Sequence, residues 1–144
     1  MNCVLNSFLA IKWVLAEPES DEALKVRGAF NNQIHKLLVP DVFPVEVAHA
    51  LAKAERRGVI RQLEGTLKLA DISDNLPDLH SYFPLLPRAF ALASQSRIGV
   101  YNCLYVALTE REGYEHLTTD DRLVRTLQPT YPFITPGVGA SSRT

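Results

Sequence analysis

The chain has 144 residues, a length that fits a single domain. Hydrophobic residues make up 47% of it and charged residues 22%, a composition that excludes an intrinsically disordered chain. The formal net charge is only −1, so the molecule as a whole is not strongly attracted to nucleic acid or to an anionic membrane, and any such contact must come from a local patch.

Cellular location is inferred mainly from features that the sequence lacks. Two cysteines, Cys3 and Cys103, are too few for a disulfide framework and are typical of a reduced protein. No basic region precedes the first apolar stretch, so we expect no signal peptide. Every apolar run is far shorter than the roughly 20 residues that span a bilayer. The sequence therefore predicts a cytoplasmic protein that makes no contact with a membrane.

The N-terminal half alternates short apolar runs with longer helical patterns. Two short apolar runs that end at a polar residue or at proline predict buried strands: 3–5 and 37–39. Two segments with helical patterns follow each run: 8–16 and 20–32 after the first, and 42–57 and 62–72 after the second. Ser7 is positioned to cap the first of these helices, and Gly58 to end the third.

The C-terminal half begins with residues 74–84, which hold Pro77 and Pro84 and fit no single pattern. Three helices are predicted beyond it: 86–96, 101–108 with an end at Gly113, and a short one from 120 to 127. Two strands are predicted in the same half: 116–119 and 133–134. The segment 101–108 is almost entirely apolar, which predicts a central helix.

Strands that alternate with helices favour a parallel sheet covered by helices on both faces. In such sheets the ligand crevice lies at the carboxyl ends of the strands. Asn6, Asp41 and Asp120 each follow a predicted strand, so we expect them at that edge. Residues 1–135 form the predicted domain, and residues 136–144, rich in Gly and Ser, are expected to be a flexible tail.

Four segments in this order resemble the PIN domain family, and especially the VapC-type toxins. Their sequences are VLNS with AIKW from residue 4, VPD with PVEVAHAL from residue 39, VYNCLYVAL from residue 100, and LTTDDRL from residue 117. Each segment alone is a weak signal, but the ordered set spans nearly the whole chain. The resemblance implies a PIN-like three-layer α/β/α fold with a short parallel sheet.

The resemblance also implies a metal-dependent endoribonuclease that cleaves single-stranded RNA. In this family acidic residues hold Mg²⁺ or Mn²⁺, hard cations that prefer oxygen ligands, and the metal activates a water. The four acidic positions fall on Asn6, Glu46, Asn102 and Asp120 of this chain. Two of them are therefore amides, and a site that loses two negative charges should bind Mg²⁺ more weakly by orders of magnitude.

Three explanations of the amides remain open. The chain is a naturally degenerate PIN domain, or it is a nuclease silenced by two Asp→Asn changes, or it still binds metal through Glu46, Asp120 and a neighbour. An attenuated nuclease and a non-catalytic module that binds RNA or a partner protein are the corresponding functions. Asp121, Thr118 and His49 are candidate supporting residues, and His49 lies three residues after Glu46 on the same helix face.

Structural roles compete with each functional one. Asn6 could be a turn residue and Asn102 a helix cap, while Asp120 and Asp121 could complement a helix dipole. A basic stretch could follow an RNA backbone, meet an acidic partner or be a solvated helix face: Lys53, Arg56, Arg57 and Arg61. The resemblance implies a homodimer and a cognate antitoxin that covers the active-site groove.

Overall fold

The computed structural model describes residues 2–15, 20–31, 36–118 and 120–136. Within these residues the strands are β1 (Asn2–Leu5), β2 (Lys36–Pro40), β3 (Asp78–His80), β4 (Glu115–Thr118) and β5 (Ile134–Pro136). The first helices are α1 (Ser7–Ile11), α2 (Ser20–Asn31), α3 (Phe43–Arg56) and α4 (Gln62–Ser73). They are followed by the 3₁₀ turn η1 (Phe83–Leu85) and by α5 (Leu86–Ser96), α6 (Val100–Glu112) and α7 (Asp121–Leu127).

The strands form one parallel sheet in the order β3-β2-β1-β4-β5. Strand β1 lies at its centre, with Cys3 paired to Leu37 of β2 and to Glu115 of β4. The predicted parallel sheet is thereby confirmed. Because all the strands run in one direction, the residues that follow β1, β2 and β4 reach the same edge of the sheet.

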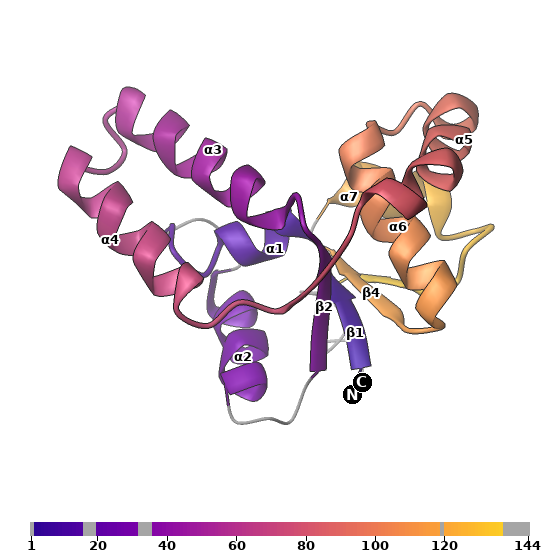
Figure 1. Cartoon of the computed structure of the whole chain (residues 1–144), viewed down its shortest axis with the longest axis horizontal. Helices are drawn as coiled ribbons and strands as arrows, with labels where there is room; N and C mark the ends of the chain where they lie inside the picture. The colour runs from indigo at the N-terminus through magenta and orange to yellow at the C-terminus, as the bar shows by residue number, and fades with distance from the viewer. Residues whose placement is uncertain (1, 16–19, 32–35, 119, 137–144) are drawn as a thin grey trace.

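Helices cover both faces of this sheet, which confirms the PIN-like three-layer α/β/α architecture. Figure 1 shows α2 and α6 on opposite sides of β1 and β2, with the α3–α4 hairpin extending away from the strands. Helix α6 packs on β1, β2 and β4. Its residues 103–109 are all buried, as expected for a central helix. The side chains of β1 and β2 that face the helices complete the core.

Glycine ends two of the predicted helices as expected. Gly58 follows α3 with φ of +73°, a backbone conformation that side chains with a Cβ disfavour. Its N–H donates to Glu55 O, and the Val59 N–H donates to Ala54 O, which together form a Schellman motif. Gly113, with φ of +70°, ends α6 in a similar way. Helices α3 and α6 are therefore held at defined lengths beside the carboxyl edge of the sheet.

The predicted first helix, 8–16, is wrong in length. Helix α1 ends at Ile11, and the following backbone forms turns in which Trp13 N donates to Ala10 O. This tighter path buries the side chains of residues 13–15 in the core. A continued helix would point these three side chains in different directions. Ser7 is also not a cap: it is the first residue of α1, and Asn6 O accepts from Leu9 N and Ala10 N.

The segment 74–84 contains a strand that the sequence patterns did not predict. Strand β3 has only three residues and pairs with β2 at the edge of the sheet. At the other edge, β5 ends at Pro136, one residue beyond the predicted boundary at 135, and the division into domain and tail stays a prediction. The remainder of that tail, residues 137–144, lies outside the described residues.

In the part of the chain that is described, no helix is both long and apolar enough to cross a membrane.

His116 of β4 is a fully buried titratable side chain in the core. Thr109 Oγ1 donates to Tyr105 O at 2.7 Å, so its single proton is used and it accepts from His116 Nδ1 at 3.0 Å. Among the described residues, His116 Nε2 has no hydrogen-bond partner. Burial lowers the pKa of His116 to about 4, because a charged imidazolium would lose its hydration here.

We expect His116 to make the protein sensitive to acid. Its pKa is lower in the folded chain than the value of about 6.5 in an unfolded chain, so protons favour the unfolded state. The stability is fully present above pH 6.5 and falls by about 3 kcal/mol as the pH drops to 4. Urea unfolding of the unaltered chain and of His116→Leu at a series of pH values measures this slope. Equal slopes for the two proteins would contradict the prediction.

Candidate functional site

A cavity of about 580 Å³ opens where three helices meet at the carboxyl edge of the sheet. Helix α1 contributes two residues to its wall, α3 contributes five, and α6 contributes two. The lining residues are Ser7, Ile11, Val45, Glu46, His49, Ala50, Lys53, Tyr101 and Asn102. The cavity therefore brings together Glu46, His49, Lys53 and Asn102, four of the residues that the sequence analysis selected.

Helical spacing explains how α3 presents its polar groups. Glu46, His49 and Lys53 follow one another at intervals of three and four residues, so they lie along one face of the helix. The opposite face carries Val47 and Leu51 into the core. Pro44 near the start of α3 fixes the backbone where the helix leaves β2. The face that lines the cavity therefore carries a carboxylate, an imidazole and an ammonium group in that order.

The Glu46 carboxylate is held by two hydroxyl groups from different helices. The hydroxyl of Tyr105 in α6 donates to Oε1 at 2.6 Å, and that of Ser7 in α1 donates to Oε2 at 3.2 Å. Burial raises the pKa of the Glu46 carboxyl, although the hydrogen bonds from Tyr105 and Ser7 act in the opposite direction. Burial and the neighbouring Glu46 carboxylate also raise the pKa of the Tyr105 hydroxyl. The three side chains form one hydrogen-bonded unit, here called the Glu46 triad.

Sequence reasoning missed two members of the Glu46 triad. Ser7 was assigned to a helix cap, and Tyr105 was counted with the apolar residues of its segment. A signal was present for Tyr105, because it lies three residues after Asn102 and therefore on the same face of α6. Its ring is fully buried, so its hydroxyl had to find a polar partner inside the protein.

Removal of the Tyr105 hydroxyl should destabilise the protein. Tyr105→Phe leaves the ring in place but takes a short hydrogen bond from a half-buried carboxylate, which costs about 1.5–3 kcal/mol. Urea unfolding at neutral pH measures this loss. The matched control is Tyr101→Phe, an exposed tyrosine on the same helix, which should change stability by less than about 0.5 kcal/mol. Equal unfolding midpoints for the two variants would show that the hydrogen bond contributes nothing.

Asn102 lies inside helix α6 and faces the cavity. Gly99 is the residue that caps the helix, so the interpretation of Asn102 as a helix cap is wrong. Gly99 itself has an extended backbone conformation just before the helix begins, and its carbonyl oxygen accepts from Cys103 N. Asn102 is partly buried on the wall that also carries Tyr101. Its side chain is therefore available to whatever enters the cavity.

Asn6 directly follows β1 and is fully buried. Its backbone N–H donates to Leu117 O of β4 at 2.9 Å, which extends the pairing of the two strands by one residue. The next residue, Ser7, lines the cavity and bonds to Glu46. Asn6 is therefore next in sequence to a member of the Glu46 triad, although it is not itself among the residues that line the cavity.

Asp120 has a clear structural role. It caps α7, with Oδ1 accepting from Arg122 N at 3.0 Å and from Leu123 N at 3.2 Å. The Asp120 N–H in turn donates to Thr118 Oγ1 at 3.0 Å, so Thr118 orients this turn. Asp121 is exposed in the first turn of the helix. Asp120 follows β4, the neighbour of the strand that ends before Asn6, but it is absent from the cavity wall.

Asp41, the remaining strand-end residue, does not line this cavity. Its Oδ1 accepts from Tyr82 N at 3.0 Å, and its own N–H donates to His80 O. Asp41 therefore fixes the connection after β3 at the edge of the sheet.

A large part of this sequence is similar to that of a curated ribonuclease. Ribonuclease VapC3 of Pyrobaculum aerophilum is 38% identical over 94 residues, which cover 64% of this chain and 72% of the relative. This chain belongs to the VapC family. No family model matches the chain.

The site of this VapC-family chain does not contain the donor set of a tight metal site. Within residues 2–15, 20–31, 36–118 and 120–136, no group of three or more His, Cys, Asp and Glu side chains could hold a metal ion. Glu46 and Asp120 already accept hydrogen bonds, and positions 6 and 102 carry neutral amides. Mg²⁺ is held in proteins mainly by carboxylates, so the side chains present do not fit a firmly bound divalent ion.

Basic residues continue from the cavity along α3. Lys53 lines the cavity, and Arg56 and Arg57 follow it within one turn at the end of the helix. Arg61 directly precedes α4, and all four side chains are exposed. Among these four residues only Lys53 lines the cavity, and the role of the three arginines stays a prediction.

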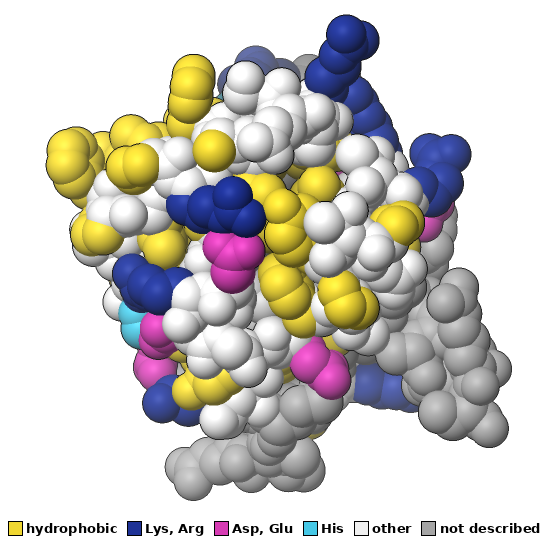
Figure 2. Space-filling view, turned by 90° about the vertical axis from the view of Figure 1, so that its right-hand side faces the viewer, with side chains coloured by type: hydrophobic (Ala, Val, Ile, Leu, Met, Phe, Trp, Pro, Cys, Tyr) yellow, Lys and Arg dark blue, Asp and Glu magenta, His cyan; other side chains and the backbone are white. Residues whose placement is uncertain are grey.

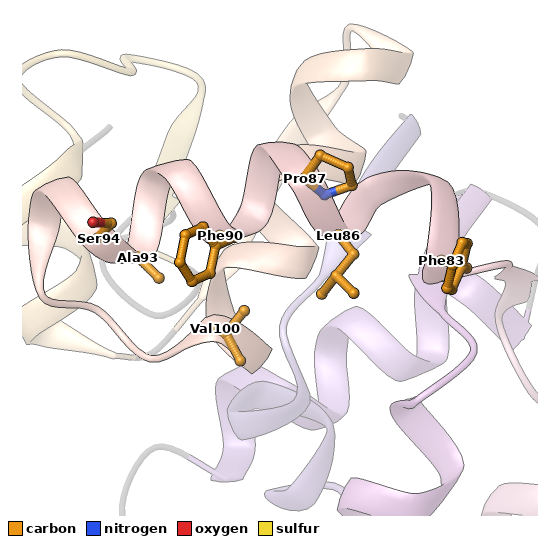
Figure 3. Close-up of a pocket in the computed structure, with 7 residues that line it drawn as sticks. All are labelled: Phe83, Leu86, Pro87, Phe90, Ala93, Ser94 and Val100. Carbon is orange, nitrogen blue, oxygen red and sulfur yellow. The ribbon is translucent and has the colours of Figure 1, made fainter.

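A second, apolar cavity of about 850 Å³ adjoins the first at the start of α6. Figure 3 shows the residues that line it: Phe83, Leu86, Pro87, Phe90, Ala93, Ser94 and Val100. Its wall holds no charged side chain, and Phe83 and Phe90 are 69% and 68% exposed. Figure 2 shows one face of the molecule, with hydrophobic side chains exposed at its upper left and across its middle. Val100 of this wall directly precedes Tyr101 of the polar cavity.

Proposed function

We propose that this chain is a VapC-type toxin, an endoribonuclease that acts on single-stranded RNA with Mg²⁺ or Mn²⁺ and is attenuated in the present sequence. The observation that carries the proposal is the convergence of Glu46 and Asn102 on one cavity, although they lie far apart in the sequence. Its VapC relative is named a ribonuclease. The polar cavity at the carboxyl ends of the strands is the expected location of a ligand in such a sheet.

The attenuation follows from the side chains at positions 6 and 102. An amide keeps the shape and one oxygen of aspartate but carries no negative charge. Attraction for a divalent cation falls with each lost charge, and we propose that the unaltered chain binds Mg²⁺ weakly through Glu46 and Asp120 with the amides as weak ligands. Thr118, Asp121 and His49 would support the site through hydrogen bonds or contact with RNA.

A non-catalytic module that binds RNA or a protein partner is the second candidate function. The observation that favours it is that both oxygens of Glu46 accept hydrogen bonds from within the protein. A carboxylate used in this way holds α1, α3 and α6 together and needs no metal. Under this alternative Lys53 and the arginines after it would retain RNA without cleavage.

We also propose, from family membership, a cognate antitoxin that covers the cavity and a homodimer. A cytoplasmic location would suit both the antitoxin and the RNA substrate.

Titration of Mn²⁺ into the unaltered chain, followed by an assay on single-stranded RNA, tests the two functions against each other. Millimolar or tighter binding, with slow cleavage that is lost in Glu46→Gln, supports the attenuated nuclease. RNA binding with neither metal binding nor cleavage supports the non-catalytic module. Cleavage that persists in Glu46→Gln and in EDTA would contradict the proposed nuclease site.

A further inference from the structure

Tyr101 is an exposed aromatic side chain on the wall of the polar cavity. It is 57% exposed, although it lies on α6, the helix that carries most of its neighbours into the core. It directly precedes Asn102, and both residues line the cavity. An aromatic face left in water beside a polar site is available to stack on a flat ligand.

The charges on the rest of the cavity wall balance, so the wall does not repel a polyanion. Glu46 is the one carboxylate among the lining residues, and Lys53 supplies a positive charge from the same face of α3. His49 lies between them as a hydrogen-bonding group. Carboxylates at positions 6 and 102 would repel a phosphate backbone in the absence of metal, whereas amides do not. The cavity in this chain can therefore accept an anion without a cation.

We propose that Tyr101 stacks on a nucleobase of single-stranded RNA whose backbone passes Lys53. The inference rests on the proposed function, because it names how the same cavity holds that substrate. Proteins that bind single strands combine positive charge along the backbone with aromatic rings under the bases. Stacking tolerates any base, so Tyr101 supplies affinity and position while Lys53 supplies the contact with phosphate.

An apolar peptide is a poorer occupant of this cavity. Such a segment would gain more from the neighbouring apolar cavity, where Phe83 and Phe90 are exposed and no charge lines the wall. The polar cavity would force it to bury the Lys53 ammonium group against a surface that offers this charge no partner. The two adjoining cavities therefore differ in the ligand they favour, and Phe90 provides a control for Tyr101.

The test uses tryptophan as a reporter of stacking. The chain contains one tryptophan, Trp13, which is 7% exposed, so a new tryptophan at the surface gives a distinct signal. Tyr101→Trp and Phe90→Trp are titrated in EDTA with a short oligoadenylate and with an abasic ribose-phosphate chain of equal length. We expect the oligoadenylate to quench Tyr101→Trp alone, and the abasic chain to quench neither variant.

Affinities measured by anisotropy of a labelled oligoadenylate complete the test. Tyr101→Ala should weaken binding by about tenfold or more, while Tyr101→Phe should stay within about twofold of the unaltered chain. Lys53→Gln should weaken binding of the oligoadenylate and the abasic chain alike and reduce the salt dependence. Unchanged affinity in Tyr101→Ala, equal quenching in Phe90→Trp, or no RNA binding by the unaltered chain would each overturn the inference.

These outcomes are separate from the fate of the proposed nuclease. RNA binding that depends on Tyr101, together with no cleavage by any variant, would leave the inference standing and remove the nuclease function. RNA cleavage together with an RNA affinity that does not depend on Tyr101 would remove the inference and leave the nuclease function standing.

Discussion

Asn6→Asp combined with Asn102→Asp is expected to tighten Mn²⁺ binding by about 100-fold or more and to produce RNA cleavage well above that of the unaltered chain. Each change adds one negative charge near Glu46 without a change of shape. One charge at 4 Å is worth about 4 kcal/mol at an effective dielectric constant of 20, and solvent screening leaves a fraction of that for each of the two charges. Calorimetric titration with Mn²⁺ and a cleavage assay on labelled single-stranded RNA measure the two effects.

Single variants and a third substitution give the controls. Asn6→Asp and Asn102→Asp alone should each recover part of the affinity, because each restores one charge. Glu46→Gln placed in the double variant should remove both metal binding and cleavage. If the double variant neither binds Mn²⁺ nor cuts single-stranded RNA, the assignment of positions 6 and 102 to a former metal site is wrong.

Local sequence signals were sufficient for most of the fold. Short apolar runs ended by Asn6 and Pro40 predicted β1 and β2, and Gly58 and Gly113 marked the ends of α3 and α6 through positive φ angles. These features depend on residues within a few positions of each other. Strand β3 could not be found in this way, because its three residues are ordered by pairing with β2 and not by a pattern of their own.

The candidate site was predictable only in part for the same reason. Glu46 and His49 were placed together because helical spacing is a local rule. The partners of Glu46 lie 39 and 59 residues away in the sequence, at Ser7 and Tyr105, and their hydroxyl groups have competing local roles. Asp120 shows the opposite case: a role at the start of a helix was foreseen as a structural alternative through the helix dipole, the capping hydrogen bonds came from the structure, and a contact with the cavity remains a prediction.

The double variant should also be less stable than the unaltered chain when metal is absent. Asn6 is fully buried and adjoins Ser7, and burial already raises the pKa of Glu46, so two further carboxylates would repel each other in a poorly hydrated region. Burial of a carboxylate away from water and without a partner costs several kcal/mol. We therefore expect the free energy of unfolding to fall by about 2–4 kcal/mol in EDTA at pH 7. Thermal or urea unfolding measures it.

The pH and metal dependence distinguish charge repulsion from damage to packing. Carboxyl groups whose pKa is raised in the folded state contribute stability below their unfolded pKa of about 4, and that contribution is lost as the pH rises through the folded value. The stability deficit of the double variant should therefore shrink in mild acid. Mn²⁺ should reverse the deficit at pH 7, because a ligand that binds the folded state adds stability that grows with the logarithm of its concentration above Kd. Asn2→Asp, the same change at the exposed start of β1, should show neither effect. A deficit that is independent of both pH and Mn²⁺ would mean that the added carboxylates do not meet, because repulsion between neighbouring charges must respond to protons and to a divalent cation.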